Sequence, residues 1–119
     1  MVNNTIIGAG VTIGGGLTPV GCTVANNLTQ GGSIGTGGQG TKIMNNVTNG
    51  AGMVMMNGLW KLTSGSPAID ASLPGFDYVM DDVDGQMRQG KPDIGADELS
   101  LDPVLRGPLT EKDVGPDAP

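Results

Sequence analysis

The 119-residue sequence has no histidine, a single cysteine and only one residue each of Phe, Tyr and Trp. Without histidine, Ser-His-Asp and Cys-His catalysis and all histidine-based metal sites are excluded. A lone Cys22 excludes a disulfide framework and a zinc-thiolate cluster. Since no histidine could act as its base, we interpret Cys22 as a buried structural thiol. Any core must therefore consist of Val, Ile, Leu and Met in narrow layers.

Acidic residues are absent from the first part of the chain. Residues 1–69 carry only Lys42 and Lys61 as charges, whereas all 12 acidic residues follow from Asp70 onward. The net charge of −6 argues against nucleic acid or an anionic membrane as a partner. No apolar run approaches the roughly 20 residues of a membrane span. The first four residues lack the basic and apolar stretches of a signal peptide, so none is expected in this chain.

A repeated segment predicts the fold of this neutral part. Val24–Gly31 matches Ile43–Gly50 position by position, in the order apolar, any, Asn, Asn, apolar, Thr, polar, Gly. A weaker copy, Met1–Ile6, precedes the first at a slightly longer interval. A period of roughly 20 residues is too short for paired-helix repeats and suits one turn of a β-solenoid. Glycine interrupts every window long enough for a helix.

We therefore predict an all-β chain whose residues 1–69 form about three turns of a parallel β-helix. Short, β-branched, glycine-bounded segments are the predicted strands: Thr5–Ile7, Val11–Ile13, Cys22–Ala25, Lys42–Met44 and Gly52–Met56. The Asn-Asn pairs at 26–27 and 45–46 are expected to form a ladder that caps the turns.

Residues 70–119 are predicted to be an acidic C-terminal cap and tail of the same domain. Ser66–Asp70 indicates a turn, Tyr78–Gln86 alternates and then turns on Asp-Gly, and Lys91–Leu99 indicates one more strand. The chain begins inside the repeat pattern, with no cap visible there. Because an uncapped end exposes unpaired strands, we expect self-association through it.

Several motifs resemble known proteins. Ser66–Asp70, Asp82–Arg88 and Asp93–Glu98 resemble the closing segment of many right-handed parallel β-helix proteins. The tail Pro108–Pro116 resembles the C-terminal end of polysaccharide lyase family 6, the alginate lyases and chondroitinase B, and Gly21–Leu28 is similar to a late turn of that solenoid. The resemblance covers most of the chain but only the last portion of a family member.

The resemblance implies β-elimination on a uronic-acid polysaccharide by a secreted or periplasmic bacterial protein. A base removes the C5 proton, an acid protonates the leaving oxygen at C4 and calcium neutralises the uronate. None of the family's catalytic Lys, Arg or calcium-ligand positions matches this sequence. We therefore expect the catalytic turns to lie outside this sequence and no cofactor to bind within it. The resemblance favours alginate over dermatan sulfate as the polymer. Whether this chain alone is an enzyme stays open.

Three residues are candidates for binding or catalysis. Lys42 and Lys61 are separated by the same interval as the two matching repeat copies, so they are predicted to stack on adjacent turns. Such a pair could bind a polyuronate, or one lysine could act as a base. The alternative is two solvated lysines. Trp60 is a candidate platform for sugar stacking, and the alternative is packing in the core or cap.

Two other patterns carry weaker signals. Asp81, Asp82 and Asp84 before Gly85 look like a fragment of a calcium loop, but the further ligands are missing. We favour an Asp-Gly turn in which Arg88 pairs with an aspartate, and predict no metal site. Gly35–Gly40 fits GxGxxG without the helix and acidic residue that a dinucleotide site needs.

Three functions stay open. The chain can be the structural C-terminal part of an alginate-lyase-like enzyme, or a stand-alone polyuronate-binding or lyase unit completed by self-association. The third is a β-helix surface or adhesion module without sugar chemistry. The tail motif favours the first two, and the missing catalytic residues favour the first.

Overall fold

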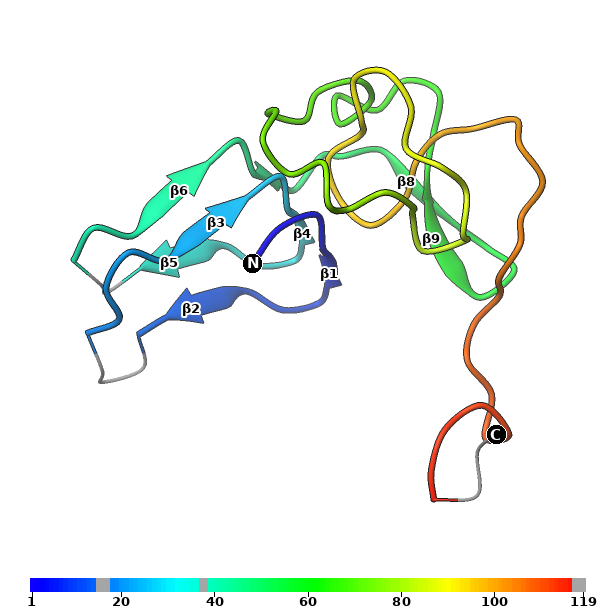
Figure 1. Ribbon diagram of the computed structural model, residues 1–119, viewed down its shortest axis with the longest axis horizontal. Coiled ribbons are helices and arrows are strands. Elements are labelled where there is room, and N and C mark those ends of the chain that lie inside the picture. Colours follow the sequence, from blue (N-terminus) through cyan, green and yellow to red (C-terminus); the bar gives the residue numbers. More distant parts are fainter. Residues whose placement is uncertain (15–17, 37–38, 117–119) are drawn as a thin grey trace.

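The computed structural model describes residues 1–14, 18–36 and 39–116, and within them every regular element is a β-strand (Figure 1). No helix there is long and apolar enough to cross a membrane. The strands, in chain order, are β1 (Thr5–Ile7), β2 (Val11–Ile13), β3 (Thr23–Ala25), β4 (Leu28–Gln30), β5 (Ile34–Thr36), β6 (Lys42–Met44), β7 (Val47–Thr48), β8 (Met53–Met56) and β9 (Leu59–Leu62).

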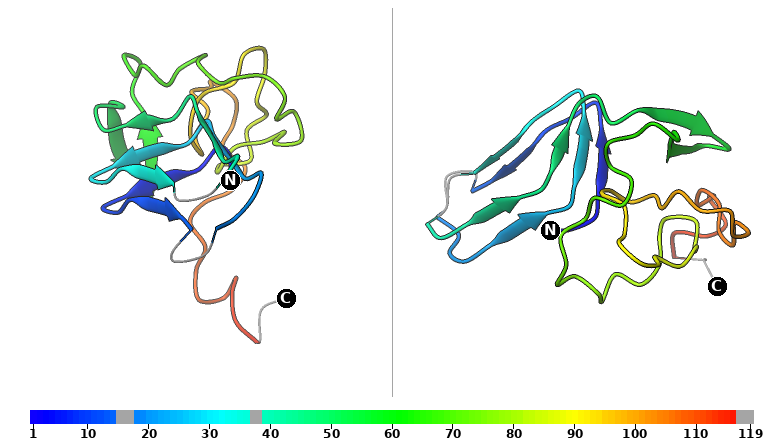
Figure 2. Two further views of the ribbon diagram at one scale, coloured as in Figure 1. Left: turned by 90° about the vertical axis from the view of Figure 1, so that its left-hand side faces the viewer. Right: turned by 90° about the horizontal axis from the view of Figure 1, so that it is seen from above.

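The first seven strands lie in three parallel sheets, ordered β1-β4-β7, β2-β5 and β3-β6 (Figure 2). Thr5 of β1 lies beside Leu28 of β4, and Leu28 lies beside Val47 of β7. Successive turns are thus offset by 23 and then 19 residues, the same intervals that separate the sequence copies. The predicted strands at Thr5–Ile7, Val11–Ile13 and Lys42–Met44 are confirmed, as is their parallel register.

The first residue of each Asn-Asn pair turns the chain. Asn3, Asn26 and Asn45 have φ angles of 53°, 53° and 52°, in the left-handed region that Asn tolerates better than most residues. The Nδ2 of Asn45 donates to the Oδ1 of Asn26 at 2.9 Å. The chain therefore bends at the same place in each successive turn.

The second residue of each pair forms a continuous column of amides. The Oδ1 of Asn27 accepts from the Nδ2 and the backbone N–H of Asn4 at 2.9 and 3.0 Å. The Oδ1 of Asn46 accepts in the same way from Asn27, both at 2.9 Å. Asn27 is fully buried, so these bonds are shielded from water. The predicted asparagine ladder is confirmed.

The chain leaves the stack after β7. A further turn with the offset of β4 and β7 would place Met53 beside Ile34, but Met53 pairs with Leu62 in the antiparallel hairpin β8–β9. Three of the four residues from Asn49 to Gly52 have positive φ (61°, 70° and 60°), which redirects the chain away from the sheets. The prediction that Gly52–Met56 forms a strand of a parallel turn is therefore wrong in its pairing, although β8 lies there.

Residues 66–99, the closing segment, are nearly all irregular. The strand predicted at Lys91–Leu99 is wrong, and an isolated bridge between Asp81 and Met87 is the one β-pairing described in the segment. The backbone N–H of Gly95 donates to the carbonyl of Asn26 at 3.0 Å, and that of Ala96 to Thr5 Oγ1 at 2.9 Å. The closing segment therefore packs directly against the stacked turns.

A small aliphatic core joins these parts. It contains one buried residue from a stacked strand, two from or beside the hairpin and two from the closing segment: Leu28, Ala51, Leu62, Ala68 and Ile94. None is aromatic, as the composition predicted. Cys22 precedes β3 and is half-buried, so its predicted full burial is wrong. The tail, residues 101–116, is exposed and runs away from the body (Figure 1).

Candidate functional site

The hairpin and the closing segment meet at buried ion pairs. The Nζ of Lys61 donates to Asp97 Oδ1 at 2.7 Å and also to Asp84 Oδ2. The side chain of Asp84 is fully buried and that of Asp97 is 5% exposed, whereas that of Lys61 is 18% exposed. The other oxygen of Asp97 accepts the backbone N–H of Leu62 at 2.6 Å. The charge of Lys61 is thus neutralised inside the protein.

Asp82 organises the turn that the sequence predicted. Its Oδ1 accepts the backbone N–H groups of Asp84 and Gln86, each at 2.8 Å, and its Oδ2 accepts that of Glu98 at 3.0 Å. Gly85 has a φ of 79°, which a turn of this kind favours for glycine. The Asp-Gly turn is confirmed.

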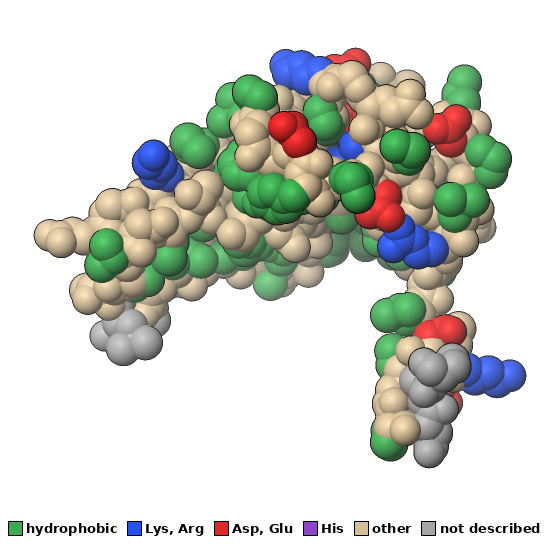
Figure 3. All heavy atoms as spheres, viewed as in Figure 1, with side chains coloured by type: hydrophobic (Ala, Val, Ile, Leu, Met, Phe, Trp, Pro, Cys, Tyr) green, Lys and Arg blue, Asp and Glu red, His purple; other side chains and the backbone are tan. Residues whose placement is uncertain are grey.

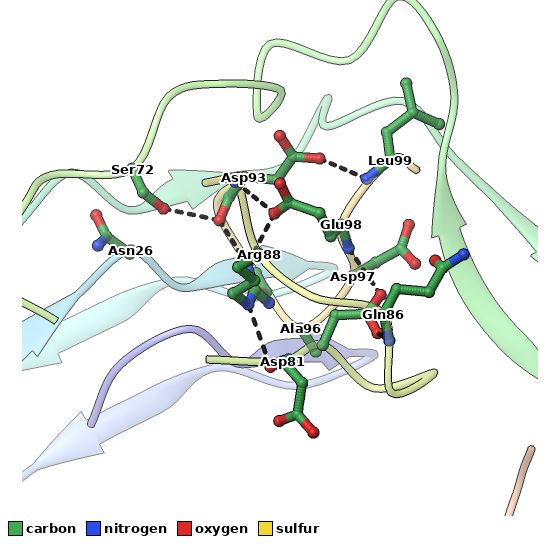
Figure 4. Close-up of polar contacts among 12 residues, drawn as sticks. Asn26, Ser72, Asp81, Gln86, Arg88, Asp93, Ala96, Asp97, Glu98 and Leu99 are labelled. Atoms are coloured by element: carbon green, nitrogen blue, oxygen red, sulfur yellow. Dashed lines mark hydrogen bonds and ion pairs between the residues drawn. The ribbon is translucent and has the colours of Figure 1, made fainter. Parts of the chain in front are cut away.

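Arg88 pairs with a glutamate, so the prediction that it pairs with an aspartate is wrong. Its Nη1 lies 3.3 Å from Glu98 Oε2, and its Nη1 and Nη2 donate to the carbonyls of Asp93 and Gly95 at 3.0 and 2.7 Å (Figure 4). The side chain is 2% exposed. Glu98 Oε2 also accepts the backbone N–H of Asp93 at 2.9 Å. The guanidinium thus joins Arg88 to the stretch from Asp93 to Glu98.

Burial sets the proton affinity of this network. Desolvation raises the pKa of Glu98 to about 7, against the opposing effects of the Asp93 backbone N–H and the Arg88 guanidinium. Desolvation also raises the pKa of Asp93, although the backbone N–H groups of Leu99 and Asp70 counteract it. Both carboxyl groups therefore bind protons more tightly in the folded protein than in the unfolded chain.

Calcium does not fit the acidic cluster as it stands. Asp82, Asp84 and Asp97 each offer one oxygen within 4.8 Å of the others. The Lys61 ammonium already lies against two of them, and both oxygens of Asp82 accept backbone N–H groups. Calcium takes six to eight oxygen ligands. One oxygen, Asp84 Oδ1, is buried without a hydrogen-bond partner. We interpret the cluster as an internal ion-pair network.

The two candidate lysines are not brought together, so their predicted stacking is wrong. Lys42 is exposed in β6, beside Thr23 of β3, whereas Lys61 lies in β9 (Figure 1). The repeat offset no longer applies at Lys61 because the chain has left the stack. On the face in Figure 3, charged side chains gather over the closing segment and tail, with few over the stacked strands.

Trp60 lines two hollows beside the hairpin. One, of 360 Å³, is also lined by Gln30 of β4; the other, of 180 Å³, is lined by Thr5 and Ile7 of β1. A third hollow, of 740 Å³, shares Leu59 and Val83 with the second and reaches the tail. We call these three hollows together the Trp60 groove.

Trp60 is 36% exposed, so one part of its ring is packed and another is open to the groove. The sequence singled out Trp60 but not its partners. Gln30 and Thr5 belong to the repeat copies, but nothing in the sequence indicated that they line hollows beside Trp60. The buried roles of Asp93, Asp97 and Glu98 were also missed, although the motif that contains them was recognised.

No protein-family model, no curated protein and no solved structure matches this chain.

Proposed function

We propose that this chain is the closing part of a right-handed parallel β-helix of the polysaccharide lyase family 6 kind. In this proposal the parent protein is a secreted or periplasmic bacterial enzyme that cleaves alginate by β-elimination, with calcium bound on its other turns. The chain itself supplies framework rather than chemistry. The observation that carries the proposal is the parallel register of β1, β4 and β7, covered by a segment that contains all three closing motifs.

The state of the charged residues supports a framework role. β-elimination needs a base at C5 and a positive charge near the uronate. The Lys61 ammonium and the Arg88 guanidinium are each paired with carboxylates of this chain, so neither is free to serve. Lys42 is exposed on β6, where its neighbour on β3 is the neutral Thr23.

An activity assay tests this proposal. The purified chain is incubated with alginate, with and without calcium, and the absorbance of the unsaturated uronate product is followed. We expect no turnover, while an active lyase of the family gives a signal under the same conditions. Turnover that disappears in Lys42→Ala would overturn the framework role and assign the base to Lys42.

A second candidate function is a self-assembling module that binds polyuronate. In the described residues, β1 pairs only with β4 and β2 only with β5, so each has an outer edge without a partner. Such edges are templates for another chain. Light scattering after size-exclusion chromatography measures the assembly. Thr12→Lys, which charges the β2 edge, should then dissociate it, whereas Val20→Lys, at an exposed site outside the strands, should not.

A further inference from the structure

Lys61 and Asp84 meet directly inside the protein. The Nζ of Lys61 contacts Asp84 Oδ2, and the Asp84 side chain is fully buried while that of Lys61 is largely buried. Lys61 lies in β9 and Asp84 in the turn of the closing segment, so the contact joins two separate parts of the fold. An amine and a carboxyl group held together away from water are the two reactants of an amide bond.

Three backbone hydrogen bonds fix the position of Asp84. Its N–H donates to Asp82 Oδ1 at 2.8 Å, and its carbonyl accepts the N–H groups of Leu105 and Arg106 at 2.9 and 2.8 Å. Its carboxyl group is less well satisfied, because Oδ1 is buried and has no hydrogen-bond partner in the part of the chain that the structure describes. Burial of this kind lowers the cost of moving the Lys61 proton onto Asp84, which gives the neutral amine and neutral acid that react.

Asp97 is the third group at this point. Its Oδ1 accepts from the Lys61 Nζ at 2.7 Å, and its Oδ2 accepts the backbone N–H of Leu62 at 2.6 Å. One oxygen of Asp97 also lies within 4.8 Å of one oxygen of Asp84. Both oxygens of Asp97 thus have donors, whereas Asp84 has one oxygen without any. Asp84 is therefore the better source of the carbonyl carbon, and Asp97 lies close enough to carry a proton from the nitrogen to the departing oxygen.

We infer that Lys61 and Asp84 form an isopeptide bond, with Asp97 as the catalytic residue that moves the protons. The bond is a covalent cross-link between the hairpin and the closing segment. It goes beyond the proposed function, because it needs neither a sugar nor the missing turns of a lyase.

The reaction balances without any other reactant. After the Lys61 ammonium has passed one proton to Asp84, the lone pair of Nζ attacks the Asp84 Cγ, and Asp97 takes a proton from the nitrogen. Asp97 then returns this proton to the Asp84 hydroxyl, which leaves with its bonding electrons as water. One C–N bond forms, one C–O bond breaks, and the Asp97 carboxylate is regenerated.

The fold takes the place of an activating agent. Condensation of a free amine with a free acid is unfavourable in water, but reactants fixed in contact reach an effective concentration of about 10⁵ M or more. Asp84 is fully buried and the side chain of Asp97 is nearly so, which keeps water from hydrolysing the new bond. Formation of the bond therefore depends on folding.

Intact-mass spectrometry of the full chain tests the inference. We expect the folded chain, as purified or after incubation at neutral pH, to be lighter than its sequence by one water, and a chain kept unfolded in urea to have the full mass. Trypsin cuts after unmodified lysine. The bond should therefore abolish cleavage after Lys61 and leave residues 43–88 as one fragment that is lighter by one water.

Variants assign the roles of the three side chains. Lys61→Arg keeps a positive charge beside both carboxylates but forms no amide, so it should retain the full mass. Asp97→Asn keeps the size of the side chain and removes the base, and it should slow bond formation by about 100-fold or more. Lys42→Arg, at an exposed lysine of β6, is the matched control and should lose water as the unaltered chain does. Circular dichroism checks that every variant is folded.

Each outcome decides the inference independently of the alginate assay. A folded chain that keeps its full mass after prolonged incubation would overturn it. Loss of one water with normal cleavage after Lys61 would do the same, because a succinimide at Asp84-Gly85 also loses water and leaves the lysine free. An unchanged rate in folded Asp97→Asn would contradict the role of Asp97. Turnover of alginate bears only on the framework role.

Discussion

The backbone N–H and C=O groups are hydrogen-bonded in different ways in the stacked turns, residues 1–48, and in the closing segment. In the turns, parallel strands pair with one another, and the corners are held by the amides of Asn27 and its neighbours. In the closing segment, buried carboxylates accept backbone N–H groups from distant parts of the chain. The first means uses neutral side chains, and the second uses charged ones.

The difference follows from repetition. Stacked strands lie about 4.8 Å apart, so each corner residue faces a copy of itself. Two amides at that distance donate and accept in turn, whereas two carboxylates would repel. The closing segment occurs once, so Asp82 or Asp97 meets backbone N–H groups and Lys61 instead of a copy of itself. Repulsion of this kind accounts for the absence of acidic residues from the stacked turns.

The largest expected effect comes from removing the carboxylate of Asp82. Asp82→Ala leaves three backbone N–H groups without their acceptor in a site that is 5% exposed. We expect the free energy of unfolding to fall by at least about 3 kcal/mol, measured by urea denaturation. Asp77→Ala, at an exposed position in the same segment, should change it by less than about 0.5 kcal/mol. Equal effects would mean that carboxylates do not hold this segment.

The second prediction concerns pH. Because the pKa of Glu98 is raised from 4.5 to about 7 on folding, its contribution is greatest below pH 4.5 and is lost as the pH rises through 7. The free energy of unfolding should therefore decrease over this range, by up to roughly 3 kcal/mol. Glu98→Gln should flatten the profile and leave the contribution of Asp93, whose pKa is also raised by burial. Glu111→Gln, in the exposed tail, should retain the full slope, and a profile that rises with pH would contradict the assignment.

The third prediction places a charge in the stacked turns. Asn27→Asp keeps the size of the side chain, but it removes the bond from Nδ2 to Asn46 and buries a negative charge beside the Asn46 oxygen. We expect a loss of about 2 kcal/mol at neutral pH that is partly recovered when the aspartate is protonated. Asn57→Asp, in the exposed turn of the hairpin, is the control. A neutral-pH stability equal to that of the control would contradict the argument from repetition.

The smallest effect tests the contact between the two regions. Gly95 has a φ of 103°, and a Cβ built there would lie 2.8 Å from Thr5 Oγ1 and 3.3 Å from Leu28 Cβ. Gly75 has a φ of 96° and nothing within 4 Å of the corresponding position. Both alanine variants carry the backbone strain, so their difference in thermal unfolding isolates the close approach. We expect Gly95→Ala to be less stable by about 1–2 kcal/mol.

The repeat made the turns predictable. Residues at corresponding positions of successive copies share the same type, so the register of Val24 with Ile43 and the asparagine ladder follow from the sequence. The exit at β8 did not follow, because Met53 and its neighbours continue the apolar pattern. The chain leaves the stack through the positive φ angles between Asn49 and Gly52. Because glycine is also frequent in the stacked turns, its presence in the sequence did not mark this exit.

The closing segment and the groove were less predictable for a related reason. Their contacts join residues with no common spacing, such as Leu62 with Asp97 and Arg88 with Glu98. An aspartate that accepts backbone N–H groups looks the same in sequence as one in solvent. Charge counting therefore predicted only an acidic cap and tail, and it did not predict that five of the carboxylates are buried: Asp82, Asp84, Asp93, Asp97 and Glu98.

Successive turns are offset by 23 and then by 19 residues, and a single connection accounts for this difference in length. The corners between β1 and β2 and between β4 and β5 are equal in length, and the two Asn-Asn corners within the stack match in the same way. The whole difference falls in one connection, residues 14–22 after β2 against residues 37–41 after β5. The four extra residues of the first interval therefore lie in one connection, and the parallel register of all three sheets is kept on both sides of it.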